Sequence, residues 1–229
     1  MKDKTLTGGI ILLILGVAVG GLLLMMMRQP TPTSDLPPAI PAKTSLTPTG
    51  RARLFKIVPE ASEARFKLGE ILRGEPKEVV GVTSLVSGEI AVDYADLSTT
   101  QVSTIVIDAR DLTTDNSFRN RAIHNYILLS SAYPEITFTP TTVDGLPETA
   151  VIGQPLTFTI TGQLTITIFS NEETFTVTAV PVSETRIEGT ATTTIQRANY
   201  ELAIPSATGV ASVDEAITLE FDFVAEQSE

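Results

Sequence analysis

Apolar and polar residues alternate along much of the chain, which is the spacing of a β-strand that buries one face. From Leu156 to Ile168 the even positions are apolar or Gly, and the odd positions are Thr or Gln. Residues 217–223 repeat this pattern. Less regular strand patterns cover residues 54–58, 62–68, 79–93, 101–107, 135–143, 173–182 and 186–196. Turn residues separate several of these strands at Asp96, Asp144-Gly145 and Ser170-Asn171.

One segment, residues 115–127, has the spacing of a helix instead. Its apolar residues recur every three to five positions and should share one side: Phe118, Ala122, Ile123, Tyr126 and Ile127. The opposite side carries Arg119, Asn120, Arg121, His124 and Asn125. Side-chain oxygens of Asp115, Asn116 and Ser117 can cap the start of the helix, and Pro134 ends the segment before the next strand.

Eight or nine antiparallel strands with one apolar face each predict an all-β domain, either a closed barrel or a two-sheet sandwich. The single short helix favours a barrel whose mouth the helix covers. An eight-stranded barrel can fill with its own side chains or hold one small ligand, and the alternation does not decide between these. Gly162, in the middle of the longest strand, predicts a bend or a close approach of backbones.

The N-terminus predicts a membrane anchor, because residues 5–27 contain no charge. As a helix, these residues would extend about 34 Å, enough for a hydrocarbon core of about 30 Å. The segment lacks a small-residue cleavage site, which favours an uncleaved transmembrane helix over a cleaved signal peptide. Lys2 and Lys4 precede it and only Arg28 follows closely, so the body should lie outside the cytoplasm of a single-pass cell-membrane protein.

Composition divides the rest of the chain into a linker and one domain. Residues 28–50 hold six prolines among Thr, Ser and Ala, which is typical of an extended tether. Residues 51–229 are long enough for one domain with a sizeable core. We therefore expect an anchor at 1–27, a linker at 28–50 and a β-barrel domain at 51–229.

The charge of the chain argues against nucleic acid as a partner. The formal net charge is −11, and residues 51–229 are more acidic still, with 25 acidic against 12 basic residues. A surface of this sign disfavours docking on nucleic acid or on anionic lipid head groups. Its simplest role is to keep the domain soluble.

The chain contains few of the residues that catalysis or metal binding requires. It has no Cys, a single histidine, no G-x-S-x-G motif and no phosphate-binding glycine loop, and we predict no catalytic site, metal or cofactor. His124 is expected to face solvent. The spacing of Asp108, Asp111 and Asp115 does not match a calcium loop and fits turns or caps.

Arg119 and Arg121 could pair with an anionic head group at the start of the helix, or with the neighbouring aspartates. The sequence leaves both alternatives open.

Several motifs, in order, resemble the YceI-like family. The segment that resembles the family's hallmark runs through Leu112-Thr-Thr-Asp115, Arg119-Asn120, Ile123, Ile127-Leu128, Tyr133-Pro134 and Phe138. Further similar pieces are Gly162-Gln-Leu164-Thr165 with Glu172–Val177, and Arg186–Gly189 with Asn199-Tyr200, Pro205 and Ala216–Val224. The chain departs from the family's pattern at Asn120, where the family has aspartate, and around Thr167 and Ile168.

The resemblance implies a lipocalin-like antiparallel barrel with a helix near its mouth and an elongated apolar lumen that binds polyisoprenoid chains. Members of the family are typically secreted or periplasmic. The residues expected to contact such a lipid are Phe118, Arg119, Arg121, Ile123, Tyr126, Ile127, Phe138, Phe158, Ile160 and Leu164. The alternative is a ligand-free structural or protein-interaction module of the cell envelope. The sequence leaves the oligomeric state open.

Overall fold

The computed structural model describes residues 45–228. The anchor predicted at residues 1–27 and most of the linker predicted at 28–50 lie outside the described residues. Within the described range, no helix is long and apolar enough to cross a membrane.

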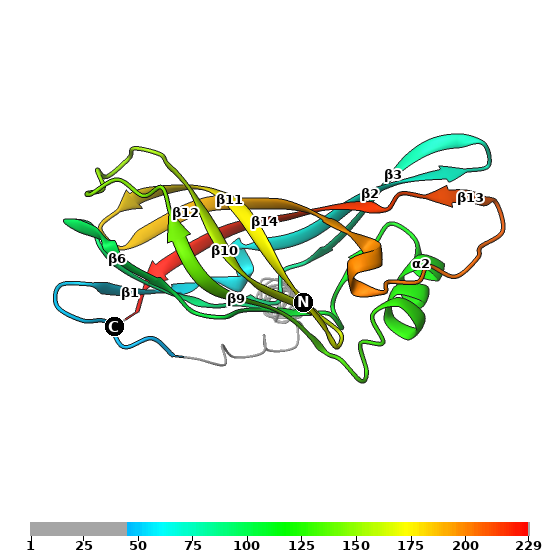
Figure 1. The fold of residues 1–229 in the computed structure, drawn as a ribbon, viewed down its shortest axis with the longest axis horizontal. Helices are drawn as coiled ribbons and strands as arrows, with labels where there is room; N and C mark the ends of the chain where they lie inside the picture. Colours follow the sequence, from blue (N-terminus) through cyan, green and yellow to red (C-terminus); the bar gives the residue numbers. More distant parts are fainter. Residues whose placement is uncertain (1–44, 229) are drawn as a thin grey trace, which may run out of the picture. The chain divides into compact units, whose positions relative to one another are not determined.

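The described chain is mostly β-strand, and its strands form one strongly curled antiparallel sheet (Figure 1). The strands are β1 (Arg53–Ile57), β2 (Glu63–Leu72), β3 (Glu75–Thr83), β4 (Val86–Ser87), β5 (Glu89–Asp93), β6 (Asp96–Val102), β7 (Ile105–Asp108), β8 (Thr113–Thr114), β9 (Glu135–Asp144), β10 (Leu156–Ile166), β11 (Phe169–Ser183), β12 (Arg186–Gln196), β13 (Val210–Val213) and β14 (Ala216–Gln227). The helical elements are η1 (Pro59–Ala61), α2 (Ser117–Ala122), η2 (Ile123–Ile127) and η3 (Arg197–Tyr200).

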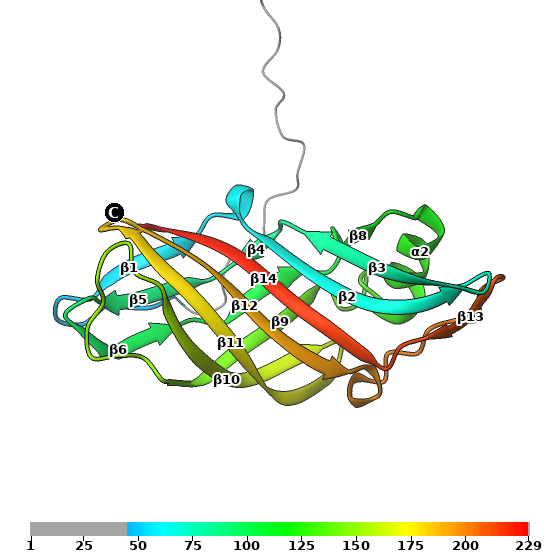
Figure 2. The ribbon, with the colours of Figure 1, turned by 90° about the horizontal axis from the view of Figure 1, so that it is seen from above.

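Strand β14 connects the last part of the sheet to the first. It pairs with β12 on one side, and on the other with β2 near Thr218–Asp222 and with β1 near Ala225–Gln227. From β7 the pairing continues in chain order through β9, β10, β11 and β12. The view from above shows these strands crossing the domain obliquely, with β6 and α2 at opposite ends (Figure 2). The inward faces of distant strands therefore share one interior.

Every predicted strand stretch contains a strand in the structure, but two predicted turns are wrong in position. Thr167 has a positive φ of 56°, so Thr167-Ile168 forms the turn between Ile166 and Phe169. Residues 170 and 171 therefore lie inside β11. The other turn falls at residues 94–95, directly before Asp96. The short strands β8 and β13 were not predicted.

The predicted helix is present, and Asn116 caps it by accepting hydrogen bonds from the backbone N–H groups of Phe118 and Arg119. The prediction of one shared apolar side is wrong, because Phe118 and Tyr126 are 75% and 67% exposed whereas Ile123 is 5% exposed. The α-helix has only six residues and continues as the π-turn η2. The wider turn changes the spacing on which the prediction rested, so Tyr126 does not follow Ile123 into the core.

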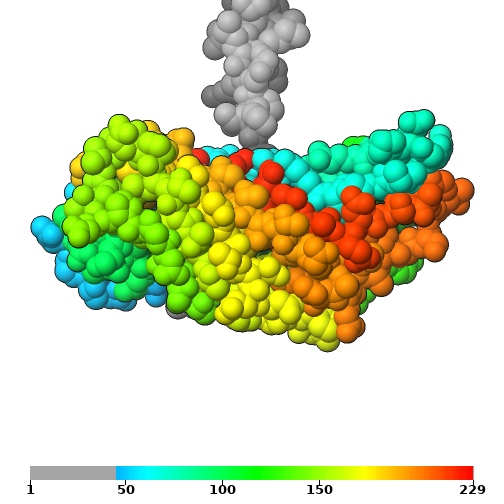
Figure 3. Space-filling model, turned by 45° about the horizontal axis from the view of Figure 1, so that its top comes forward, coloured from blue at the N-terminus to red at the C-terminus, as the bar shows by residue number. Residues whose placement is uncertain are grey.

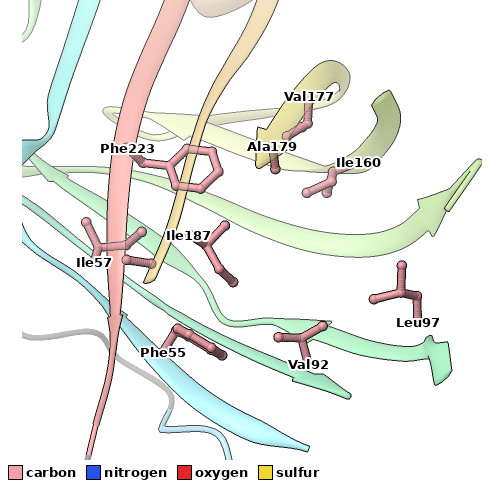
Figure 4. Packing of buried hydrophobic residues seen from close by; sticks show 10 residues of the cluster. Phe55, Ile57, Val92, Leu97, Ile160, Val177, Ala179, Ile187 and Phe223 are labelled. Atoms are coloured by element: carbon pink, nitrogen blue, oxygen red, sulfur yellow. The ribbon is translucent and has the colours of Figure 1, made fainter. Parts of the chain in front are cut away.

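Two apolar clusters pack the interior. The first gathers side chains from both sides of the curled sheet, with Phe223 and Ile187 facing Val92 and Phe55 (Figure 4). The second lies beneath α2 and η2, where Ile123 and Leu128 pack with residues of β10, β12 and β14. Phe138 contacts both clusters.

The close backbone approach predicted at Gly162 is confirmed. A Cβ atom there would overlap the carbonyl oxygen of Thr139 and lie 2.8 Å from the Cα atom of Pro140, beside an irregularity in the β9–β10 register. Because these are backbone atoms, they cannot rotate away.

We therefore expect Gly162→Ala to lower the free energy of unfolding by about 2 kcal/mol, as overpacking does in other cores. Urea denaturation followed by circular dichroism measures this loss. The control is Gly69→Ala, whose Cβ would meet only the mobile carboxylate of Asp214. Equal stability of the two variants would contradict the explanation.

Candidate functional site

The curled sheet encloses a cavity of about 1180 Å³. Its lining is mainly apolar and comes from the inward faces of strands on all sides, such as Leu68 on β2, Ile160 on β10 and Phe221 on β14. On the outside, the side chains of β11, β12 and β14 form a continuous wall (Figure 3). Typical small-molecule pockets measure about 300–1,000 Å³, so this interior has room for a sizeable ligand.

The cavity opens at the end where α2 lies. Seven lining residues are exposed to solvent, and all belong to α2, the residue before it, the β2–β3 turn, the start of β3 or the loop before β13: Arg73, Glu75, Asn116, Phe118, Pro205, Ala207 and Thr208. At the opposite end, around the β5–β6 hairpin, the lining residues are buried or half-buried. The cavity is thus a blind tunnel, and we call its exposed end the mouth.

Glycines keep three aromatic rings against the wall of the cavity. The ring of Phe223 occupies the space of a side chain at Gly189, its partner across the strands, where a Cβ would lie 2.6 Å from ring atom Cζ. Phe66 covers Gly81 in the same way, and Phe138 covers Gly162. Because each ring lies over a bare backbone, these phenylalanines line the interior without filling it.

A network of ion pairs holds α2 at the mouth. Arg119 Nη2 lies 2.7 Å from Glu70 Oε1, and Arg119 Nη1 lies 2.6 Å from Asp115 Oδ1. Asp115 also accepts from Lys77 Nζ at 2.8 Å, and these contacts with Lys77 and then Arg119 hold the pKa of Asp115 below its usual range. Glu70 is 6% exposed and Arg119 18%. The sequence left two alternatives for Arg119, an anionic head group or a neighbouring aspartate, and the structure shows the pair with Asp115.

Eight of the ten residues predicted to contact a ligand line this one cavity: Phe118, Arg119, Ile123, Ile127, Phe138, Phe158, Ile160 and Leu164. Two do not line it. Tyr126 is exposed, and the guanidinium carbon of Arg121 lies 5.5 Å from the centre of the Phe118 ring. Asn120, the departure from the family pattern, accepts hydrogen bonds from the N–H and hydroxyl of Thr114.

The aspartates near the helix have structural partners. Burial alone would raise the pKa of Asp108, but hydrogen bonds from Arg110 hold that pKa below its usual range. Asp111 accepts from the hydroxyl of Thr83. No group of residues suited to a metal occurs among the described residues. His124 is half-buried, with Nδ1 3.1 Å from the Ser130 hydroxyl, and so is less exposed than expected.

Glu70 is the residue that sequence reasoning missed. The predicted strand stopped at residue 68, whereas β2 continues to Leu72. Extending the alternation by two residues places Glu70 on the inward face with Phe66 and Leu68. A carboxylate on an apolar face calls for a cationic partner, which is the signal that could have identified it.

Comparisons with known proteins agree with this architecture. A model of the YceI-like domain matches residues 55–225. No curated protein matches the chain.

Several solved structures share the fold. A polyisoprenoid-binding domain from Saccharophagus degradans implicated in plant cell wall breakdown has a TM-score of 0.59 and 15% identity, over 76% of this chain and 98% of that one. Burkholderia cenocepacia BcnA has a TM-score of 0.58 and 17% identity, over 73% and 98%. A Campylobacter jejuni YCEI protein has a TM-score of 0.52 and 19% identity, over 63% and 82%.

Replacing Arg119 by methionine would leave the buried carboxylate of Glu70 without its partner. We expect Arg119→Met to lower the free energy of unfolding by about 3 kcal/mol, measured by urea denaturation at neutral pH. Arg186→Met is the control, because Arg186 pairs with Glu188 and Glu226 on the outer surface and should contribute little.

The double variant Glu70→Leu/Arg119→Met should recover most of the lost stability, because it removes both charges together. An Arg119→Met variant as stable as the unmodified chain would show that the pair does not hold α2 in place.

Proposed function

The chain belongs to the YceI-like family, and we propose that its domain binds the apolar chain of a lipid, a polyisoprenoid or a similar molecule, in the interior of the sheet. The observation that carries this proposal is the blind tunnel of about 1180 Å³ with its mainly apolar lining. In most proteins, apolar side chains in the interior pack against one another and leave no cavity of this size. Here a ligand would fill the space and cover the apolar lining. The solved structure of a polyisoprenoid-binding domain with the same fold supports the ligand class.

We further infer that the curled sheet is a lipocalin-like barrel of eight strands. Three of the eight strands are interrupted by short breaks. The first consists of β1 and β2, the second of β3, β4 and β5, and the third of β6 and β7. Each of the eight then pairs with the next along the chain, and β14 pairs back with β1 and β2. A closed barrel of this size matches an interior that holds one small ligand.

The driving force would be the removal of apolar surface from water. Burying about 330 Å² at roughly 25 cal/mol per Å² contributes about 8 kcal/mol, from which the entropic cost of association is subtracted. A preformed tunnel needs little rearrangement to accept the chain, and this reduces the entropic cost of binding. Binding of this kind is passive and needs no catalytic group.

The N-terminal segment would keep the domain near its source of ligand. Residues 5–27 would anchor the chain in the cell membrane, with the domain outside the cytoplasm, and the Pro-rich linker would act as a tether. A tether of this length raises the effective concentration of the mouth at the bilayer, where an apolar lipid is found. The acidic composition favours an uncharged lipid over an anionic one.

A large side chain placed inside the tunnel should block the ligand. Ala191 lines the cavity from β12, so we expect Ala191→Phe to weaken binding of a fluorescent isoprenoid probe by at least about tenfold. Fluorescence titration of the purified chain measures this. Thr194→Phe is the matched control, because Thr194 lies exposed on the same strand, and its affinity should not change.

Saturable binding by the unmodified chain and by Thr194→Phe, lost in Ala191→Phe, is the expected result. If the unmodified chain shows no saturable binding, the lipid-binding proposal is wrong. A ligand-free structural module of the cell envelope would then be the better reading.

A further inference from the structure

The outer side of the helical segment at the mouth is largely apolar and faces solvent. Between residues 118 and 129 the exposed positions have the spacing of one helical side: Phe118, Arg121, Asn125, Tyr126 and Leu129. The three apolar members, Phe118, Tyr126 and Leu129, are 75%, 67% and 44% exposed. We call these five residues the outer face. Large apolar side chains gathered on a surface commonly mark a site of interaction with a protein or a membrane.

The outer face is continuous with the entrance of the tunnel. Phe118 is exposed on the outer face and also lines the cavity. The guanidinium of Arg121 lies over the Phe118 ring, with 5.5 Å between its central carbon and the ring centre, and this contact keeps the two side chains together. Helix α2 lies at one end of the domain (Figures 1 and 2). A partner that covers the outer face would therefore also lie at the mouth.

The charges at the mouth differ from those of the rest of the domain. Residues 116–134 contain no Asp or Glu, and Asp115, just before them, is already held in ion pairs. Within the described residues, every Lys and Arg pairs with a carboxylate except Arg73 and Arg121. Arg73 lies in the β2–β3 turn and lines the mouth. Both arginines that could bind an anion from outside the domain are thus at the mouth.

We propose that the outer face, together with Arg73, docks on the surface of a lipid bilayer of zwitterionic lipids such as phosphatidylcholine. The apolar side chains would enter the boundary between head groups and acyl chains, where aromatic side chains of membrane proteins are enriched. The guanidinium groups of Arg73 and Arg121 would donate hydrogen bonds to the lipid phosphates.

The charge of the domain favours zwitterionic over anionic lipids. An anionic bilayer would repel a domain with 25 acidic and 12 basic residues, whereas a zwitterionic one carries no net charge. Its ammonium groups also suit the exposed carboxylate of Glu75, which lines the mouth. The lipid phosphates then find arginines, and the ammonium groups find a carboxylate, at the same end of the domain.

A bilayer also agrees with the N-terminal anchor proposed above. A tether of residues 28–44 reaches up to about 50 Å at roughly 3 Å per residue. The 15-residue strand β11 has about the same length, so such a tether would let the mouth reach the bilayer. Docking rests on the lipid-binding function for its purpose and extends it, because an apolar chain could pass from the bilayer into the tunnel without crossing water.

A single tryptophan can test the docking, because the chain contains none. Tyr126→Trp places the reporter on the outer face, at a position that does not line the tunnel. Val151→Trp is the matched control. Val151 is 60% exposed and lies in the β9–β10 loop, which bonds to the β5–β6 hairpin at the blind end through the Ala150 N–H and the Tyr94 carbonyl.

The full chain of each variant is reconstituted into phosphatidylcholine vesicles with or without brominated acyl chains, which quench tryptophan at short range. We expect brominated lipid to lower the emission of Tyr126→Trp by about half and to leave that of Val151→Trp unchanged, because an interfacial helix buries its apolar side about 5–10 Å deep. Equal quenching of both variants, or of neither, would overturn the docking. The isoprenoid titration of the unmodified chain would still decide separately whether the tunnel binds lipid.

Two further changes test whether the outer face itself makes the contact. Adding Arg121→Glu and Leu129→Asn to Tyr126→Trp should abolish the quenching, since they introduce a carboxylate and remove an apolar side chain. Asparagine suits the positive φ of 49° at Leu129, and neither residue lines the tunnel. Quenching that persists would contradict the proposal. A dimer of the detergent-solubilised chain that these two changes dissociate would overturn it in favour of a second copy on the outer face.

Discussion

The structure depends on one constraint: β14 must pair with β12 on one side and with both β1 and β2 on the other. This double pairing curls the sheet, so the apolar faces of all its strands turn toward one interior and do not need a second sheet to cover them. Because it is paired on both sides, β14 itself has no exposed edge at which another chain could add. The same pairing fixes the width of the interior, and the side chains then decide whether that interior is filled.

Small residues keep the interior open. At Gly81, Gly162 and Gly189 a phenylalanine ring lies on the bare backbone of a neighbouring strand, so it contributes buried area without crossing the space. These rings give the strands their apolar contacts, while the middle of the tunnel is left open. The lining residues Ile160 and Phe223 also belong to the packed clusters. A ligand in the tunnel would therefore contact the same side chains that hold the fold together, and binding would add to stability.

Much of the fold follows from the sequence, because a period of two residues is a direct signal for strands with one buried face. The regular alternation at residues 156–168 and 217–223 predicted most of β10 and β14 directly. The pattern could not show that Thr167 adopts a positive φ, since that depends on the local turn, nor that Phe118 and Tyr126 face solvent. A sequence can show that a helix has an apolar side, but it does not show whether other parts of the protein pack against that side. In addition, the π-turn η2 changes the helical spacing after Ala122.

The candidate site was predictable in its apolar part and not in its polar part. Strand alternation identifies inward residues such as Phe158 and Leu164, because burial of apolar side chains is what the pattern reports. It does not report which polar residues are exceptions on the inward face. Glu70 interrupts the apolar inward face of β2, and its role depends on what lies across the interior. Glu70 faces Arg119 from α2, and this partner becomes evident only when the fold brings the helix beside β2. The two ends of the tunnel therefore differ in charge: ion pairs lie at the mouth, whereas no charged residue of the lining lies on β5 or β6. That asymmetry would give an otherwise uniform apolar tunnel a direction.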